Sequence, residues 1–161
     1  MTGTLLFICT GNTCRSPMAE RLVKHALLAE GAPLNKLDVR SAGVAAGNGY
    51  PASSNSLAAL KKVGIDLNDH SSTQASESLL ESADLIFGMT HSHLDSTHYY
   101  LGENAENKLF LMREFIENAE DKEIPDPFGG SFTEYENARD SMVEAIPSLI
   151  QFLKTKFPSS E

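Results

Sequence analysis

Short apolar runs alternate with segments of helical pattern along this chain of 161 residues, and this alternation constrains the fold more than any other feature. Four runs predict strands, at residues 5–8, 37–41, 84–89 and 108–111. Helical patterns cover about residues 17–30, 53–63, 76–82, 91–101 and 133–156. Such alternation is typical of an α/β fold, whose parallel sheet binds ligands at the carboxyl ends of its strands.

Local signals predict where the first and last helices begin. Ser16 is a good N-cap, with Pro17 at the first helical position. Thr133 and Glu136 have the spacing of a capping box at the start of the last helix. Pro147 falls inside that helix, where it either kinks the helix or lies where its neighbours tolerate it.

The stretch from Cys9 to Pro17, CTGNTCRSP, places a thiol between the first strand and the first helix. Backbone N–H groups of such a loop and the positive end of the helix point at one small volume, so an anion is expected there. The same field favours the thiolate form of Cys9. Arg15 adds a planar guanidinium that can bind two phosphate oxygens at once. Together these residues predict a cysteine-dependent phosphatase.

The alternatives to an anion-binding loop here are weaker. A bare C-x5-R pattern arises easily by chance, but the strand before it and the helix after it make the signal specific. The remaining alternative is a buried structural cysteine before an ordinary helix. Nucleotide-binding and dinucleotide-binding loops both need more glycines, and Gly11 is the only glycine between Cys9 and Pro17.

Composition agrees with one soluble domain over residues 1–161, with 41% hydrophobic and 22% charged residues. The net charge of −9 argues against a nucleic-acid partner, while a positive cleft on an acidic surface still admits a phosphorylated substrate. No apolar run has the length of a membrane span and no leader pattern is found, so we expect no membrane contact and a cytoplasmic location. Two cysteines with C-x4-C spacing predict neither a disulfide framework nor a zinc site.

Asp126 is the second chemical element, because breaking a phosphate ester or phosphoramidate requires a proton for the leaving group. It stands in the run PDPFGG at 125–130, where a stiff start precedes a pair of glycines. Taken alone, Asp126 is as well explained as a turn aspartate.

The chain resembles the low-molecular-weight protein tyrosine phosphatases over nearly its whole length. The resemblance rests on CTGNTCRSPMAE at 9–20, SAG at 41–43 and DPFG at 126–129. Within that family the chain is similar to the bacterial branch that removes phosphate from protein arginine. The residues that support this narrower match are Thr13, MTH at 89–91 and DPFGGS at 126–131.

The resemblance implies a fold and a set of site residues. The fold would be a phosphatase I-like single-domain three-layer sandwich, with a four-stranded parallel sheet flanked by helices. Asp126 would be the general acid, and Phe128 would form one wall of the substrate entrance unless it is a core aromatic. A hydrogen-bond network that holds the loop open would involve Asn12, Ser16, Ser41 and His70. Asn12 also tolerates the left-handed backbone of a tight anion cradle.

The expected mechanism is a two-step displacement. Cys9 attacks phosphorus, while Arg15 and the backbone N–H groups of the loop residues hold the phosphoryl oxygens. These residues are Thr10, Gly11, Asn12, Thr13, Cys14 and Arg15. Asp126 protonates the leaving group, and water then hydrolyses the phosphocysteine. No metal and no organic cofactor are expected, and the partners are phosphorylated proteins.

Three alternative functions differ from a phosphoarginine phosphatase. A phosphotyrosine-specific enzyme of the same family is the main one, and Thr13 favours arginine because tyrosine-specific members commonly carry an aliphatic residue there. An arsenate reductase-like enzyme relays electrons through further cysteines, which are missing beyond Cys9 and Cys14. A phosphopeptide-binding module would need neither Cys9 nor Asp126.

Two smaller predictions concern other side chains. Cys14 is expected either to trap oxidised Cys9 in a reversible disulfide or simply to pack in the loop. His91, His93 and His98 do not share one face of the helix at 91–101, so solvated histidines are expected rather than a metal site.

Overall fold

The computed structural model describes residues 3–159, and these contain a four-stranded sheet with the strand order β2-β1-β3-β4. All three neighbouring pairs run parallel, as predicted. The strands are β1 (Thr4–Cys9), β2 (Asp38–Gly43), β3 (Leu85–Gly88) and β4 (Leu109–Leu111). Because β1 lies between β2 and β3, Cys9 ends a central strand at the carboxyl edge of the sheet.

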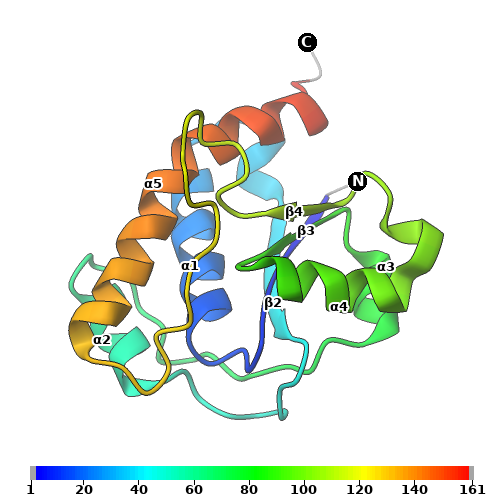
Figure 1. Ribbon diagram of the computed structural model, residues 1–161. Coiled ribbons are helices and arrows are strands. Elements are labelled where there is room, and N and C mark those ends of the chain that lie inside the picture. Colours follow the sequence, from blue (N-terminus) through cyan, green and yellow to red (C-terminus); the bar gives the residue numbers. More distant parts are fainter. Residues whose placement is uncertain (1–2, 160–161) are drawn as a thin grey trace.

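Helices cover both faces of this sheet and complete the predicted three-layer sandwich. They are α1 (Arg15–Leu27), α2 (Ser54–Lys61), α3 (Glu77–Ser82), α4 (His91–Leu101) and α5 (Phe132–Lys156). Short 3-10 turns follow α1 at Leu34–Lys36 and α4 at Gly102–Ala105. In Figure 1 α1 and α5 lie together on one side of the sheet, and α3 and α4 lie on the other.

Burial on both faces of the sheet explains why β1 is apolar from Leu5 to Cys9. Leu5 and Phe7 belong to the larger core cluster, which also takes in α1 and α5. Leu6 and Ile8 point the other way into a smaller cluster with α3 and α4. A strand covered on both faces has no solvent side on which polar residues are favourable.

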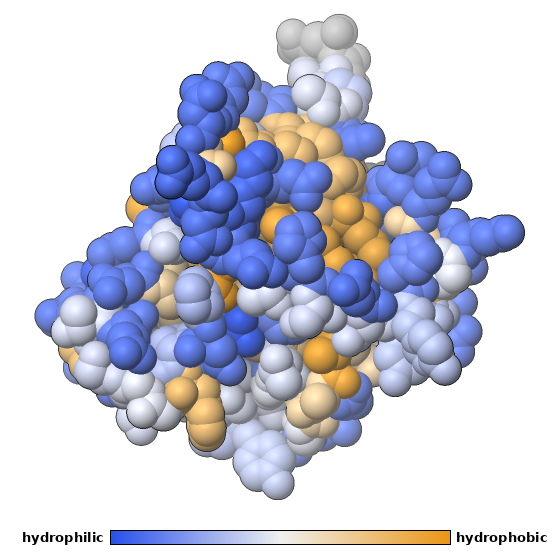
Figure 2. Space-filling model, in the orientation of Figure 1, coloured by the Kyte–Doolittle hydropathy of each residue, from blue (hydrophilic) through white to orange (hydrophobic). Residues whose placement is uncertain are grey.

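The outer strand β4 is covered partly by aromatic side chains. Its Phe110 packs edge-on against Phe152 of α5 at 4.9 Å between ring centroids, and Phe115 stacks on Phe152 at 4.0 Å. Figure 2 shows hydrophobic residues gathered over β4 on a face that is otherwise mostly hydrophilic. Within residues 3–159, no helix combines the length and the apolar character needed to cross a membrane.

The predicted start of the first helix is wrong. Helix α1 begins at Arg15 after Cys14, so Ser16 lies inside the first turn and does not cap it. The Ser16 hydroxyl instead lies 2.9 Å from Cys9 Sγ, because the loop before the helix takes up its hydrogen bonds.

The predicted capping box of the last helix is also wrong. Helix α5 begins at Phe132 after Ser131, and this N-cap makes no side-chain hydrogen bond. Glu136 accepts from Lys62, the C-cap residue of α2, at 3.1 Å, so it connects the two helices rather than capping its own N-terminus. Pro147 lies inside α5, which continues to Lys156.

Candidate active site

A cavity of about 210 Å³ opens where β1 ends and α1 begins. Its wall comes from two segments that lie far apart in the sequence, the loop after β1 and the loop before α5. The lining residues are Cys9, Thr10, Gly11, Thr13, Cys14, Arg15, Asp126 and Phe128. The structure therefore brings the predicted nucleophile, cation and acid around one small volume.

Asn12 organises the loop from inside. Its backbone has φ +54°, in the left-handed region that asparagine tolerates, and the residue is fully buried. The side-chain oxygen accepts from Thr73 N at 2.9 Å, which orients the amide so that Nδ2 donates to Ser16 and Ser41 at 2.8 and 3.0 Å. His70 Nε2 lies 2.7 Å from the Asn12 carbonyl oxygen. The predicted network residues are thus in contact, while their part in catalysis stays a prediction.

The hydroxyl groups of Ser16 and Ser41 extend this network to Cys9 and Glu20. Ser41 accepts from Asn12 and donates to Glu20 Oε1 at 2.7 Å. Ser16 also accepts from Asn12, and its hydroxyl lies 2.9 Å from Cys9 Sγ and 3.4 Å from the Ala42 carbonyl, to which it can donate. Either atom can be the donor between Ser16 and a protonated Cys9, whereas a Cys9 thiolate can only accept.

Gly43, at the end of β2, makes room for the loop. A Cβ atom there would lie 2.5 Å from the Thr10 carbonyl oxygen and 2.9 Å from Asn12 N. Any side chain at this position would displace the backbone of the anion-binding loop. This steric conflict explains why the SAG run at 41–43 ends in glycine.

Arg15 is buried, with 3% of the residue exposed. Its Nη1 donates to the Ile124 carbonyl at 3.0 Å, and its Nη2 lies 3.6 Å from Asp126 Oδ2. Among the buried side-chain nitrogen and oxygen atoms of residues 3–159, Arg15 Nε alone has no hydrogen-bond partner. A buried donor without a partner lowers the stability of the fold. An oxyanion bound in the cavity could accept a hydrogen bond from this guanidinium N–H group and remove that cost.

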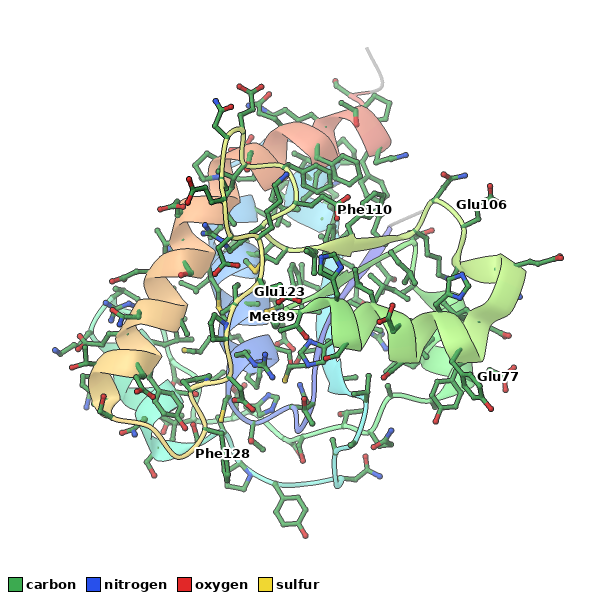
Figure 3. The ribbon with its side chains drawn as sticks, viewed as in Figure 1. Glu77, Met89, Glu106, Phe110, Glu123 and Phe128 are labelled. Atoms are coloured by element: carbon green, nitrogen blue, oxygen red, sulfur yellow. The ribbon has the colours of Figure 1, made fainter. Side chains whose placement is uncertain are left out.

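The loop that carries Asp126 is anchored at its start. Ile124 N donates to the Met89 carbonyl at 2.8 Å, and Glu123 accepts from His91 N at 2.7 Å. Figure 3 shows Glu123 and Met89 close together, with Phe128 further along the same loop. Asp126 Oδ1 accepts from Phe128 N at 3.0 Å, which leaves Oδ2 facing Arg15.

Phe128 is 76% exposed and lines the cavity, so the core-aromatic alternative is wrong. Its position at the rim is the one expected of an entrance wall, a role that stays a prediction. Thr13 is half-buried in the same wall.

Cys14 is a free, buried cysteine on the same wall as Cys9, which is also free. Its Sγ lies 3.6 Å from the hydroxyl of Tyr135 in α5. Burial, followed by this contact with Cys14, raises the pKa of Tyr135 to about 12. The reversible disulfide with Cys9 stays a prediction.

Sequence reasoning missed His93. The helical spacing predicts a solvated side chain, but His93 is only 2% exposed, whereas His91 and His98 are exposed as predicted. Its Nδ1 accepts from Thr90 N at 3.1 Å at the start of α4, and its Nε2 lies 3.4 Å from Arg15 Nη2. Burial, and then the charge of Arg15, lowers its pKa to about 4. The available signal was the capping-box spacing of Thr90 and His93 directly after a strand.

A comparison with known protein families decides what this cavity belongs to. The model of the low molecular weight phosphotyrosine protein phosphatases matches residues 4–159. The chain belongs to this family. The match confirms the resemblance inferred from the CTGNTCRSPMAE and DPFG runs, and it identifies the chain as a phosphatase rather than a reductase-like enzyme or a binding module.

Similar members of the low molecular weight phosphatase family include two that are named protein-arginine-phosphatase. The Bacillus subtilis protein is 41% identical over 150 residues, covering 93% of this chain and 96% of its own length. The Geobacillus stearothermophilus protein is 38% identical over 152 residues, covering 94% and 97%. A solved mutant of the YwlE arginine phosphatase, with a phosphorylated active-site serine, gives a TM-score of 0.84 at 39% identity over 94% of this chain and 95% of that one.

Proposed function

We propose that this phosphatase removes phosphate from arginine side chains of proteins through a phosphocysteine formed on Cys9. The observation that carries the proposal is the arrangement of Cys9, Arg15 and Asp126 around one cavity of about 210 Å³. The similarity to two proteins named protein-arginine-phosphatase supports the choice of arginine.

In the first step the Cys9 thiolate attacks phosphorus, so that an S–P bond forms and the P–N bond to the arginine side chain breaks. Asp126 gives its proton to the leaving nitrogen. Arg15, through its unpaired Nε, and the backbone N–H groups of residues 10–15 hold the three phosphoryl oxygens. A thiolate can only accept, so the Ser16 hydroxyl, 2.9 Å from Cys9 Sγ, donates to it and stabilises it before attack and after its release.

In the second step water attacks the phosphocysteine and Asp126 takes up its proton. The S–P bond breaks, inorganic phosphate leaves, and the Cys9 thiolate is restored. Asp126 stands at the rim and is 48% exposed, so it can reach both a leaving group that enters from solvent and the water that replaces it.

Thr13 supports arginine over tyrosine. A phosphorylated arginine presents N–H groups beside the phosphorus, where tyrosine presents an oxygen and an apolar ring. The Thr13 hydroxyl in the cavity wall can accept from those N–H groups, whereas an aliphatic side chain would leave them unpaired. The second candidate is a phosphotyrosine phosphatase, which the exposed Phe128 ring at the rim favours because it can stack on a tyrosine ring.

The proposal includes phosphorylated proteins as partners and the cytoplasm as the location. With a net charge of −9, the protein is not expected to bind nucleic acid. No metal ion takes part in either step.

The test compares two synthetic peptides that differ only in carrying phosphoarginine or phosphotyrosine, in a buffer with a metal chelator. We expect a higher kcat/KM for the phosphoarginine peptide and no phosphate release by Cys9→Ser. Faster release from the phosphotyrosine peptide would establish the second candidate instead. Failure to hydrolyse either peptide would overturn the proposal as a whole.

A further inference from the structure

The hydroxyl group of Thr10 lines the cavity but has no role in the mechanism proposed above. This residue follows Cys9, lines the cavity and is exposed. Its Oγ1 lies 3.1 Å from Nε2 of His93 in α4, a contact between residues 83 positions apart. In the described part of the chain, the Thr10 hydroxyl has no other hydrogen-bond partner.

We propose that His93 is a positioning residue that turns the Thr10 hydroxyl into the cavity, where it donates a hydrogen bond to a phosphoryl oxygen of the substrate. The inference rests on the proposed phosphatase activity and adds a side-chain donor to the backbone cradle.

The tautomer of His93 follows from its surroundings. Nδ1 lies 3.1 Å from Thr90 N, 3.3 Å from Met89 N and 3.3 Å from the Thr90 hydroxyl, which can donate as well as accept. Backbone N–H groups only donate, so Nδ1 must present a lone pair, and the proton of the neutral ring sits on Nε2. If both ring nitrogens were protonated, the Nδ1–H group would face these backbone N–H groups, and no hydrogen bond could form between them.

The Nε2–H group then has a single acceptor. Its two neighbours are Thr10 Oγ1 at 3.1 Å and Arg15 Nη2 at 3.4 Å. A guanidinium nitrogen does not accept hydrogen bonds, so Nε2–H donates to Thr10. Once its oxygen accepts from His93, the Thr10 hydroxyl must direct its own proton away from the imidazole.

An acceptor for that proton is supplied by the substrate. Asp126 is the one carboxylate in the cavity wall, but its Oδ1 accepts from Phe128 N and its Oδ2 faces Arg15. Arg15 Nη2, next to His93, can only donate, and the nitrogen atoms of an arginine side chain also carry protons. Phosphoryl oxygens are the acceptors that a phosphorylated substrate brings into this cavity. The Thr10 hydroxyl is therefore complementary to the group that is transferred rather than to the side chain that leaves.

The ring is held rigidly enough to act in this way. It is buried, and its Nδ1 is fixed at the first turn of α4. Burial and the charge of Arg15 lower its pKa to about 4, and the opposing charges of Asp126 and Glu123 do not offset these effects. His93 thus remains neutral, with its proton on Nε2, at the pH at which such an enzyme works.

Four variants separate this role from a structural one. His93→Asn retains an oxygen that can accept from Thr90 N but is too short to reach Thr10, and His93→Gln can reach Thr10 with its amide N–H. Thr10→Val removes the hydroxyl at nearly constant shape, and Thr10→Ser keeps it. The matched controls are His98→Asn on the exposed side of α4 and Thr133→Val, an exposed position of α5.

We expect His93→Asn and Thr10→Val each to lower kcat/KM for p-nitrophenyl phosphate about ten-fold and to weaken inorganic phosphate inhibition by a similar factor. The double variant should lose no more than either single one, because both remove the same contact. His93→Gln and Thr10→Ser should recover most of the activity, and both controls should match wild type.

Wild-type kinetics with Thr10→Val would overturn the inference, and so would losses that multiply in the double variant. A defect in His93→Asn without one in Thr10→Val would mean that His93 acts through Arg15 alone. If His93→Asn does not fold, the pair Thr10→Val and Thr10→Ser decides the question. A wild-type protein that hydrolyses nothing would instead refute the proposed function, and phosphate affinity measured by calorimetry would still test the contact.

Discussion

At the scale of single residues, the site depends on buried polar side chains whose partners are fully specified. Asn12 contacts Ser16, Ser41 and Thr73 through one amide, and each contact has a fixed donor. Arg15 Nε is the exception, since it is buried and lacks a partner. A buried N–H group without a partner is expected where a bound ligand supplies the acceptor.

Replacement of the nucleophile tests the role of Cys9. Cys9→Ser should abolish turnover of p-nitrophenyl phosphate but retain inorganic phosphate binding, because a hydroxyl fits the cradle without ionising there. Turnover and calorimetric binding are measured on the same preparation, with Ser71→Ala as an exposed control. Appreciable turnover by the variant would place the nucleophile elsewhere.

Thr13 tests which amino acid carries the phosphate. Thr13→Ile should lower the kcat/KM for a phosphoarginine peptide by roughly ten-fold or more, through the loss of a hydrogen bond to a charged group. The same change should spare or raise the kcat/KM for a phosphotyrosine peptide. If both values fall together, Thr13 only shapes the loop and the preference for arginine loses a main support.

His93 predicts a dependence of stability on pH. Its pKa is about 4 in the folded protein against 6.5 for an ordinary histidine. Between these two pH values the unfolded chain therefore binds more protons than the folded protein. The contribution of neutral His93 to the free energy of unfolding is complete above pH 6.5 and is lost as the pH falls towards 4. The loss should be up to roughly 3 kcal/mol of the free energy of unfolding.

Urea unfolding from pH 7 to pH 4 measures this effect as the difference between wild type and His93→Asn, in which the titrating ring is absent. His98→Asn serves as the control on the same helix. Parallel pH profiles for wild type and His93→Asn would show that the ring does not titrate as its burial implies.

At the scale of elements, the site lies where the first turn of α1, the first turn of α4 and the loop before α5 meet. Arg15 is the contact that joins them, because it donates to Ile124 of the loop and lies against His93 of α4. The loop that carries Asp126 is held at its start by Met89, the residue that follows β3. The start of the loop is thus fixed, while the Asp126 side chain lies partly exposed at the rim of the cavity.

Asp126→Asn tests the acid assigned to this loop. The variant should lose on the order of 10² to 10⁴ in kcat, together with the limb of the pH–rate profile that requires a protonated acid. The control is Asp95→Asn, an exposed position on α4. An unchanged pH profile would assign the proton transfer to another group.

The sequence predicts these elements better than it predicts their ends. Apolar runs and helical spacing are local signals, so all four strands and all five helices lie close to where they are expected. Ser16 misled the prediction because its hydroxyl serves the loop rather than the helix backbone. The local spacing of Thr90 and His93 indicates only that the ring folds back on the start of its helix, and its burial against Arg15 depends on a contact between distant segments. The strand order likewise depends on pairing between distant segments.

At the scale of the whole molecule, the protein carries a net charge of −9 yet buries a cation at its site. An oxyanion that satisfies Arg15 Nε binds only the folded state and therefore stabilises it. The site and the global stability are linked through this one guanidinium.

Thermal unfolding measures that link. Phosphate at about 100 times its Kd should add roughly 2.7 kcal/mol, or a rise in Tm of about 5 to 10 °C for a chain of this size. Chloride at equal ionic strength is the control, and Arg15→Ala should remove the difference between the two salts. Equal Tm values in phosphate and chloride would show that the cavity does not bind the anion.

The central place of β1 also has a consequence for synthesis. The loop from Cys9 to Arg15 leaves the ribosome before the Ile124 carbonyl that anchors Arg15, which is 109 positions further along the chain. The neighbour β3 and the covering helix α5 are also made much later than β1. Contacts so distant in sequence form late in folding. Until Ile124 and the elements around it have folded against β1, a nascent chain therefore carries the Cys9 thiol without the anchored guanidinium beside it.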